Sequence, residues 1–251
     1  MDSKVATFRA SLLFVLCALV DCLVLLAIGL LAGIDLAFLV PCSVVVASIW
    51  ILCVYWKIDS FILRKIHAKS VKQHEHPRFL NLVEGVCISY GFRKPELFIV
   101  EDVAPNMMMV GRGPQRSNLV VTTGLLDRVE RTELEGLITH ELARSRSRTS
   151  YLEGALAILV AWPWSFLPGV VSKISDKLMD PWSIAEIDVA AVGLTRYPPG
   201  LGKALESLYS DGREPTHNPR FCRHMWINPP SEPLISSGFT TDDRIVALAE
   251  L

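Results

Sequence analysis

The 251-residue sequence has almost no net charge, because 25 Lys and Arg residues balance 26 Asp and Glu residues to a formal value of −1. Proteins that bind nucleic acid need a basic surface, so the overall charge gives no indication of a nucleic-acid partner. Charged residues are also few, at 20%, whereas 51% of the residues are hydrophobic. This composition is too apolar for an ordinary soluble domain, and it indicates membrane-spanning segments.

Cysteine is sparse and follows no pattern. Four of the six cysteines lie inside apolar runs and two are isolated, and they are Cys17, Cys22, Cys42, Cys53, Cys87 and Cys222. None has the spacing of a metal site, and no disulfide framework is evident. We interpret them as small buried hydrophobic residues of a protein in a reducing compartment.

Two long apolar runs begin the chain, at residues 10–32 and 36–56. Each has about the 20 residues that a bilayer crossing needs, and residues 33–35 offer a tight turn between them. The first run is too long for a signal-peptide core and is followed at once by the second, so we expect an uncleaved transmembrane hairpin. Asp21 inside the first span is either a functional residue, a hydrogen-bonding partner of a neighbouring helix or a residue close to the membrane interface.

Basic residues flank both outer ends of this hairpin, and none occurs in its turn. They are Lys4 and Arg9 before it, and Lys57, Arg64, Lys65, Lys69 and Lys72 after it. The positive-inside rule therefore places both ends in the cytoplasm. We expect a multi-pass protein of the inner (cytoplasmic) membrane whose soluble part faces the cytoplasm.

The remaining sequence alternates helical and strand patterns. A helix is expected from Pro77 to Gly91, and short apolar strands are expected at 96–100 and 118–123. A further helix is expected at 132–144, with Thr132 and Glu135 as a capping box. Short strands beside helices indicate a small mixed α+β layer.

The helix at 132–144 carries His140-Glu141, the start of a His-Glu-x-x-His zinc motif. In that motif two histidines one turn apart hold Zn²⁺, and the Glu acts as general base on the metal-bound water. Here Arg144 stands at the second histidine position. A guanidinium has no lone pair to give to a metal, so this ligand is missing.

Several short segments together resemble the HtpX-like membrane metallopeptidases, a family of gluzincins. The matching segments are 105–106, 111–112, 121–126, 133–136 and 140–142. The resemblance implies a mainly helical α+β metallopeptidase domain with a small mixed sheet at 59–251, preceded by the two-helix transmembrane hairpin at 1–58. It also implies a zinc endopeptidase of protein quality control that acts on damaged or misassembled membrane proteins.

The same resemblance reveals a second missing ligand. The family's third zinc ligand is a Glu four residues before an Asp on a later helix, and here Asp188 matches that Asp while Ile184 stands at the Glu position. Glu186 lies two helical steps, about 200°, from position 184 and should face away. The resemblance thus leaves His140 as the remaining metal ligand, Glu141 as a vestigial general base, and Asp188 as a residue that orients the metal-binding histidine.

His224 belongs to a segment, 224–229, that matches a family region near the active site. It is a candidate substrate-side residue. Alternatively, His140, His224 and one carboxylate rebuild a metal site, or the two histidines are hydrogen-bonded members of a polar pocket.

An apolar segment at 154–171 raises a question of topology. As one membrane crossing it would separate Asp188 from His140, which the resemblance places in one pocket. We therefore expect a membrane-associated hairpin, shallow or re-entrant, bent at 163–164 and 168–169.

Arg144, Arg146 and Arg148 precede this segment and suit an anionic membrane surface. In an alternative hypothesis, the Arg144 guanidinium replaces the metal ion as the positive partner of Glu141, Asp188 or both.

Two functions are compatible with these residues. The first is a proteolytically inactive homologue, a pseudoenzyme without a cofactor that acts as a scaffold, assembly subunit or peptide-binding module in a membrane complex. The second is an active zinc endopeptidase with an altered metal site. Zinc hydrolases need about three protein ligands, which favours the first.

The expected partners are membrane lipids and other membrane proteins. Peptide binding is predicted by strand addition to a sheet edge formed by Ser117, Asn118, Leu119, Val120, Val121, Thr122 and Thr123.

Overall fold

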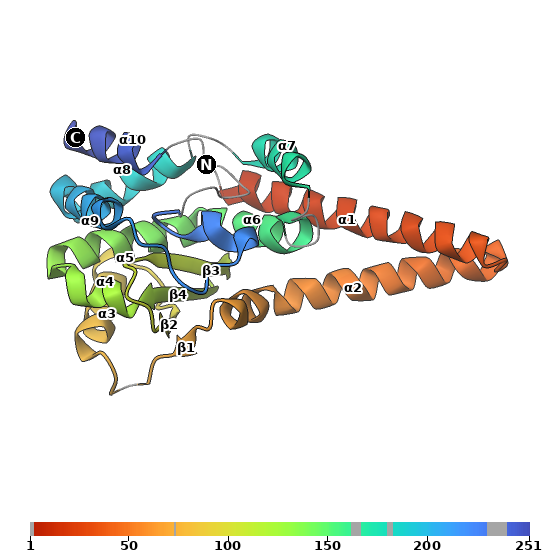
Figure 1. The fold of residues 1–251 in the computed structure, drawn as a ribbon, viewed down its shortest axis with the longest axis horizontal. Coiled ribbons are helices and arrows are strands. Elements are labelled where there is room, and N and C mark those ends of the chain that lie inside the picture. Colours follow the sequence, from red (N-terminus) through yellow and green to blue (C-terminus); the bar gives the residue numbers. More distant parts are fainter. Residues whose placement is uncertain (1–2, 73, 162–166, 180–182, 230–239) are drawn as a thin grey trace.

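The computed structural model describes residues 3–72, 74–161, 167–179, 183–229 and 240–251. It is mainly helical, with one small mixed sheet, and a long two-helix hairpin projects from the part that contains the sheet (Figure 1). The predicted α+β class, with its N-terminal hairpin, is confirmed.

The hairpin consists of α1 (Ser3–Leu31) and α2 (Leu36–Lys65). Both helices are long and apolar enough to cross a membrane. Only 17% of the most apolar window of each is buried, so these are not the core helices of a soluble protein. The turn is as predicted: Gly33 has a left-handed φ of +73°, and the Asp35 side chain accepts a hydrogen bond from the Ala37 amide at 2.9 Å.

The sheet has four strands in the order β1-β2-β4-β3. β4 pairs with β2 in parallel and with β3 antiparallel, and β1 is a short antiparallel addition to β2. The strand β3 is not predicted above. The bounds are β1 Lys69–Ser70, β2 Glu96–Val100, β3 Met107–Gly113 and β4 Arg116–Thr122.

Both faces of the sheet are buried. Side chains of successive strand residues point to opposite faces, and here Met107, Leu119 and Val121 join one core cluster while Met108 and Val120 join the other. The first cluster includes residues of the helices at 77–90, 131–146 and 198–211, and the second includes residues of the hairpin and of the segment 151–161. The sheet therefore separates two hydrophobic cores.

Helix α5 (Arg131–Arg146) lies at the centre of the soluble part and contacts α8, α9 and β3 (Figure 1). A Cβ atom at Gly136 would come within 2.9 Å of the Leu201 backbone, so glycine allows α9 its close approach. The predicted capping box is wrong by two residues, because the Glu133 carboxylate accepts a hydrogen bond from the Glu130 amide at 2.9 Å.

The other helices surround α5 and the sheet. They are α3 (Pro77–Tyr90), α4 (Thr123–Arg128), α6 (Thr149–Leu156), a π-helical turn η1 (Ala157–Ala161), α7 (Pro168–Leu178), α8 (Ser183–Thr195), α9 (Pro198–Asp211), a 3₁₀ segment η2 (Arg220–Met225) and α10 (Thr241–Ala249). The predicted start of α3 at Pro77 and its end at Gly91 are confirmed.

The apolar segment at 154–171 begins in α6 and η1, which are buried throughout and contact α1 and β3. α7 begins at Pro168, at one of the two expected bends. The other bend, at 163–164, falls outside the described residues. Contact of this segment with the membrane remains a prediction.

Candidate functional site

Helix α5 places three ionisable side chains inside the protein: His140 and Glu141 are fully buried, and Arg144 is 1% exposed. One helical turn separates His140 from Arg144, so both face the same buried region. Burying charged groups costs free energy unless each is paired. The partners of these three residues therefore define the site.

His140 meets Asp188 across the α5–α8 contact. His140 Nε2 lies 3.2 Å from Asp188 Oδ1, and His140 Nδ1 lies 3.3 Å from Glu141 Oε1. Ile184, one turn before Asp188, is buried, while Glu186 is exposed, as expected from its rotation about the helix. The structure thus brings His140, Glu141 and Asp188 together.

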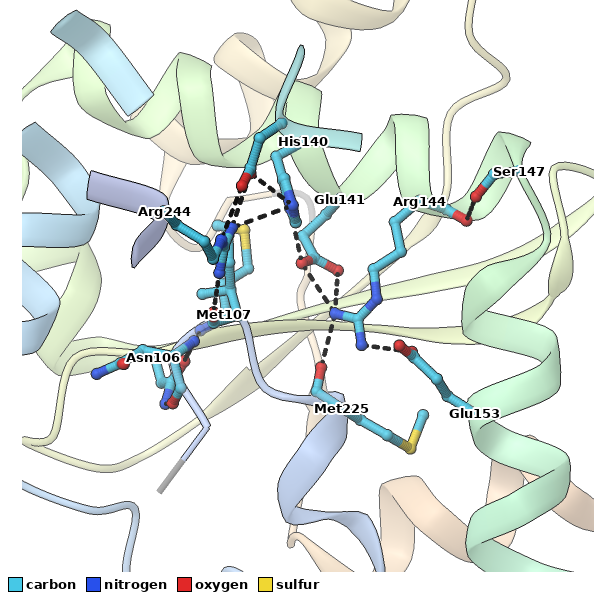
Figure 2. A network of polar contacts seen from close by, with 12 residues as sticks. Asn106, Met107, His140, Glu141, Arg144, Ser147, Glu153, Met225 and Arg244 are labelled. Atoms are coloured by element: carbon cyan, nitrogen blue, oxygen red, sulfur yellow. Dashed lines mark hydrogen bonds and ion pairs between the residues drawn. The ribbon is translucent and has the colours of Figure 1, made fainter. Parts of the chain in front are cut away.

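Arg244 of α10 is the main partner of Asp188. Its Nε and Nη2 atoms each lie 2.8 Å from one carboxylate oxygen of Asp188, and Nη1 donates to the Ile227 carbonyl at 2.7 Å (Figure 2). Burial raises the pKa of Asp188, but Arg244 more than offsets this and holds the pKa well below its usual range. A planar guanidinium suits this bidentate geometry.

Arg244 also approaches the histidine, with Nη2 3.2 Å from His140 Nε2. The same Nε2 lies 3.2 Å from Asp188 Oδ1, so it donates to Asp188 or accepts from Arg244 depending on the tautomer. Burial lowers the pKa of His140, but hydrogen bonds to Asp188 and Glu141 outweigh it and hold the pKa above its ordinary value. Both ring nitrogens therefore face partners within the protein.

Arg144 lies between two buried carboxylates (Figure 2). Its Nη1 is 3.2 Å from Glu141 Oε1 and donates to the Met225 carbonyl at 2.8 Å, while Nη2 donates to Glu153 on α6. Arg144 is therefore the positive partner of Glu141, as one hypothesis above expects, but not of Asp188, which Arg244 binds. It does not reach a membrane surface.

One guanidinium cannot fully stabilise two buried carboxylates, and their pKa values separate. Burial raises the pKa of Glu141, but Arg144 and His140 outweigh it and hold the pKa below its ordinary value. Burial raises the pKa of Glu153 to about 7, with a contribution from Glu141 and against the lowering effect of Arg144. Glu153 is thus the carboxylate of this pair that gains a proton near neutral pH.

The sequence interpretation does not name Arg244 or Glu153. A weak signal exists for Arg244, because it stands four residues before Leu248 and so shares the apolar face of the last helix. Glu153 is a single acid beside an apolar run. Its place in the site can be inferred only once its partner, Arg144, is known.

His224 lies in η2 and is buried. Its Nε2 is 3.3 Å from the Glu153 carbonyl, and its Nδ1 has no hydrogen-bond partner among the described residues. Burial lowers the pKa of His224 to about 3, so the ring is neutral. It contacts the backbone of α6, and its expected substrate-side role remains a prediction.

The predicted peptide-binding edge is wrong. Segment 117–123 belongs mostly to β4, which is an inner strand paired on both sides. Its backbone donors and acceptors already serve the ladders with β2 and β3. The neighbouring edge strand β3 is itself partly covered, because Met108 forms a bridge with Trp226 and the Met107 carbonyl accepts from the Ile227 amide at 2.8 Å.

The residues around His140 do not fit a zinc ion. Arg144 carries no lone pair and Ile184 is apolar, while the carboxylates of Glu141 and Asp188 are held by guanidinium groups. Within the described ranges, no three His, Cys, Asp or Glu side chains gather closely enough to hold a metal. The alternative metal site made of His140, His224 and one carboxylate is therefore not found among the described residues.

Comparison with known proteins adds independent evidence. Residues 73–177 match the profile of peptidase family M48. A protease HtpX homologue of Dictyoglomus turgidum is 30% identical over 224 residues, which cover 76% of this chain and 73% of the relative. HtpX homologues of Dictyoglomus thermophilum (28% over 227 residues, 76% of this chain and 75% of the relative) and Pyrococcus abyssi (34% over 162 residues, 61% and 56%) are also similar. No solved structure matches.

Proposed function

Because this chain belongs to the HtpX-like members of peptidase family M48, we propose that it is a membrane-anchored homologue without proteolytic activity. It acts by binding, as a scaffold or as an assembly subunit of a membrane complex. Its M48 relatives are zinc metallopeptidases, so the difference must lie in the site.

One observation carries the proposal: two guanidinium groups contact the residues at which the family resemblance expects the zinc site. Arg144 is bonded to Glu141, the residue at the general-base position, and Arg244 is bonded to Asp188 and directed at His140 Nε2. Together they supply two positive charges, the same charge as a zinc ion, opposite the three carboxylates of Glu141, Glu153 and Asp188. When Glu153, whose pKa burial raises to about 7, holds a proton, the remaining two carboxylates are balanced by the chain's own side chains.

Glu141 in this arrangement is a poor general base. A base must accept a proton from a water held in place beside it. Here Glu141 accepts from Arg144, and its pKa is held below the ordinary value. Both effects oppose proton uptake.

The hairpin anchors the protein in this proposal. α1 and α2, which are long and apolar enough to do so, cross the membrane in this proposal. The basic residues at their outer ends support a soluble part that faces the cytoplasm. Partners are then other membrane proteins that meet the chain beside or within the bilayer.

Metal analysis and a proteolysis assay test the proposal. The full chain, purified in detergent, is expected to carry no stoichiometric zinc and to leave casein intact. About one zinc per chain, lost in His140→Ala, together with casein cleavage lost in Glu141→Gln, would overturn it.

Restoring the ligands provides a companion experiment. Arg144→His with Ile184→Glu rebuilds the family's ligand set beside His140. Zinc uptake by this double variant, but not by the same variant with His140→Ala added, is expected if the site was lost by these substitutions.

A further inference from the structure

The two helices of the hairpin diverge toward the part that contains the sheet (Figure 1). A large apolar cavity is lined by residues of both helices and of η1 and α7. At the far end of the hairpin the helices are close together, since a Cβ atom at Gly29 would meet the Leu39 side chain at 2.1 Å. Toward the soluble part they separate, and the cavity has a volume of about 1330 Å³. This exceeds the roughly 300–1,000 Å³ of ordinary small-molecule pockets.

Four elements form the wall: α1, α2, η1 and α7. Along α1 the lining runs from Leu13 to Val24, eleven steps of about 1.5 Å each, or about 16 Å. An elongated apolar space of this length suits a hydrocarbon chain better than a compact polar metabolite. Representative wall residues are Leu13, Val20, Val54, Phe61, Leu159 and Ile174.

Five Asp and Lys residues also line the cavity, and three of them are lysines: Lys57 on α2, and Lys173 and Lys177 one turn apart on α7. All three lysines are exposed, and none forms an ion pair with a carboxylate of the described residues. The two acids are Asp21 and Asp176. The Asp176 carboxylate accepts from the Ser172 hydroxyl at 3.3 Å.

Helix α7 has the pattern of a helix at a membrane interface. Val170, Ile174 and Leu178 recur every four residues and line the cavity, while Lys173 and Lys177 form an adjacent basic stripe. Such a helix places its apolar face toward acyl chains and its lysines toward anionic headgroups.

We propose that this cavity binds one anionic glycerophospholipid. Its acyl chains lie along the apolar wall between α1 and α2, and its phosphate lies next to Lys57, Lys173 and Lys177. The apolar length and the unpaired lysines together require a ligand with a long hydrocarbon part and a negative head. This site is separate from the cluster around His140, and the inference does not depend on whether the protein cleaves peptides.

Lipid retention measures this site directly. The full chain is reconstituted in vesicles of equal parts phosphatidylglycerol and phosphatidylcholine, extracted in mild detergent, and analysed by native mass spectrometry. We expect about one phosphatidylglycerol per chain to remain, in excess over phosphatidylcholine. Each lysine near an anionic surface contributes about fivefold in affinity, so Lys57→Ala, Lys173→Ala and Lys177→Ala together should weaken retention about a hundredfold.

Matched controls separate binding from misfolding. Lys72→Ala, Lys94→Ala and Lys203→Ala together remove three lysines outside the cavity and should leave retention unchanged. Val54→Trp fills the cavity with the lysines intact and should displace the lipid, whereas Val45→Trp places the same ring on α2 away from the lining. Each variant must keep the thermal unfolding midpoint of the wild type to be compared.

Two outcomes would overturn the proposal. Equal retention of the two lipids would show that the lysines do not select the headgroup. Retention by the cavity-lysine variant at the wild-type level would show that any bound lipid is ordinary annular lipid.

Discussion

Removal of Arg144 tests the buried charge cluster most directly. Arg144→Ala leaves Glu141 and Glu153 buried without the guanidinium that both of them use. Breaking a buried pair by deleting one partner costs about 3–5 kcal/mol. For a chain of this size that lowers the midpoint of thermal unfolding by on the order of 10 °C.

The cost should depend on pH, and this dependence identifies its cause. Arg144 lowers the pKa of both acids, so without it Glu153 takes up its proton at a higher pH than in the wild type. As the pH falls toward 5.5, Glu153 gains a proton first, because burial has already raised its pKa to about 7 in the wild type. The difference in free energy of unfolding between wild type and Arg144→Ala should therefore shrink as the pH falls.

Tryptophan fluorescence of the full chain in detergent, heated at one scan rate, reports the midpoint. Arg213→Ala removes an exposed arginine that pairs with Asp211 and should change the midpoint little. A variant with Arg144→Met, Glu141→Gln and Glu153→Gln removes the charges together and should recover most of the loss. An Arg144→Ala midpoint equal to wild type at both pH values would refute the reasoning.

Three further predictions concern Arg244, Val121 and Glu153. Arg244→Ala should destabilise by about 3–5 kcal/mol, because Asp188 loses a bidentate partner; an effect no larger than that of Arg213→Ala would contradict this. Val121→Pro should lower the unfolding midpoint of the whole soluble part, since Val121 lies in the inner strand β4; an unchanged midpoint would mean that β4 is not an inner strand. For Glu153, the folded pKa of about 7 lies above the ordinary 4.5, so its own contribution to stability is fully present at low pH and should fall by about 2–3 kcal/mol between pH 5 and pH 8. Glu153→Gln should remove that slope in a denaturant series.

Features that depend on local pattern were predictable. The hairpin follows from two apolar runs and a short turn, whose meaning does not depend on distant residues. The placement of Asp188 beside His140, with Ile184 on the same face and Glu186 turned away, follows from helical rotation once the two helices are assumed to meet.

Prediction of the sheet succeeded only in part. β3 has the sequence Met-Met-Met-Val-Gly-Arg-Gly and lacks alternation, because a strand covered on both faces needs none. Without β3, the strand at 117–123 looked like an edge. Its interior position depends on pairing with β3, whose sequence has no alternating pattern that would predict a strand.

The site likewise has some features that the sequence predicts and others that only tertiary packing sets. The sequence alone predicted that His140, Glu141 and Arg144 lie on one helix, since this needs only residue identity and helical spacing, and the family resemblance implied that Arg144 and Ile184 stand at two metal-ligand positions. The tertiary structure decided which cations balance the buried acids. Arg244 is 56 residues from Asp188 and 104 from His140 along the chain, and Glu153 reaches Arg144 only because α6 packs beside α5. Ion pairing depends on distance in space, and only the packing of α5, α6, α8 and α10 sets those distances.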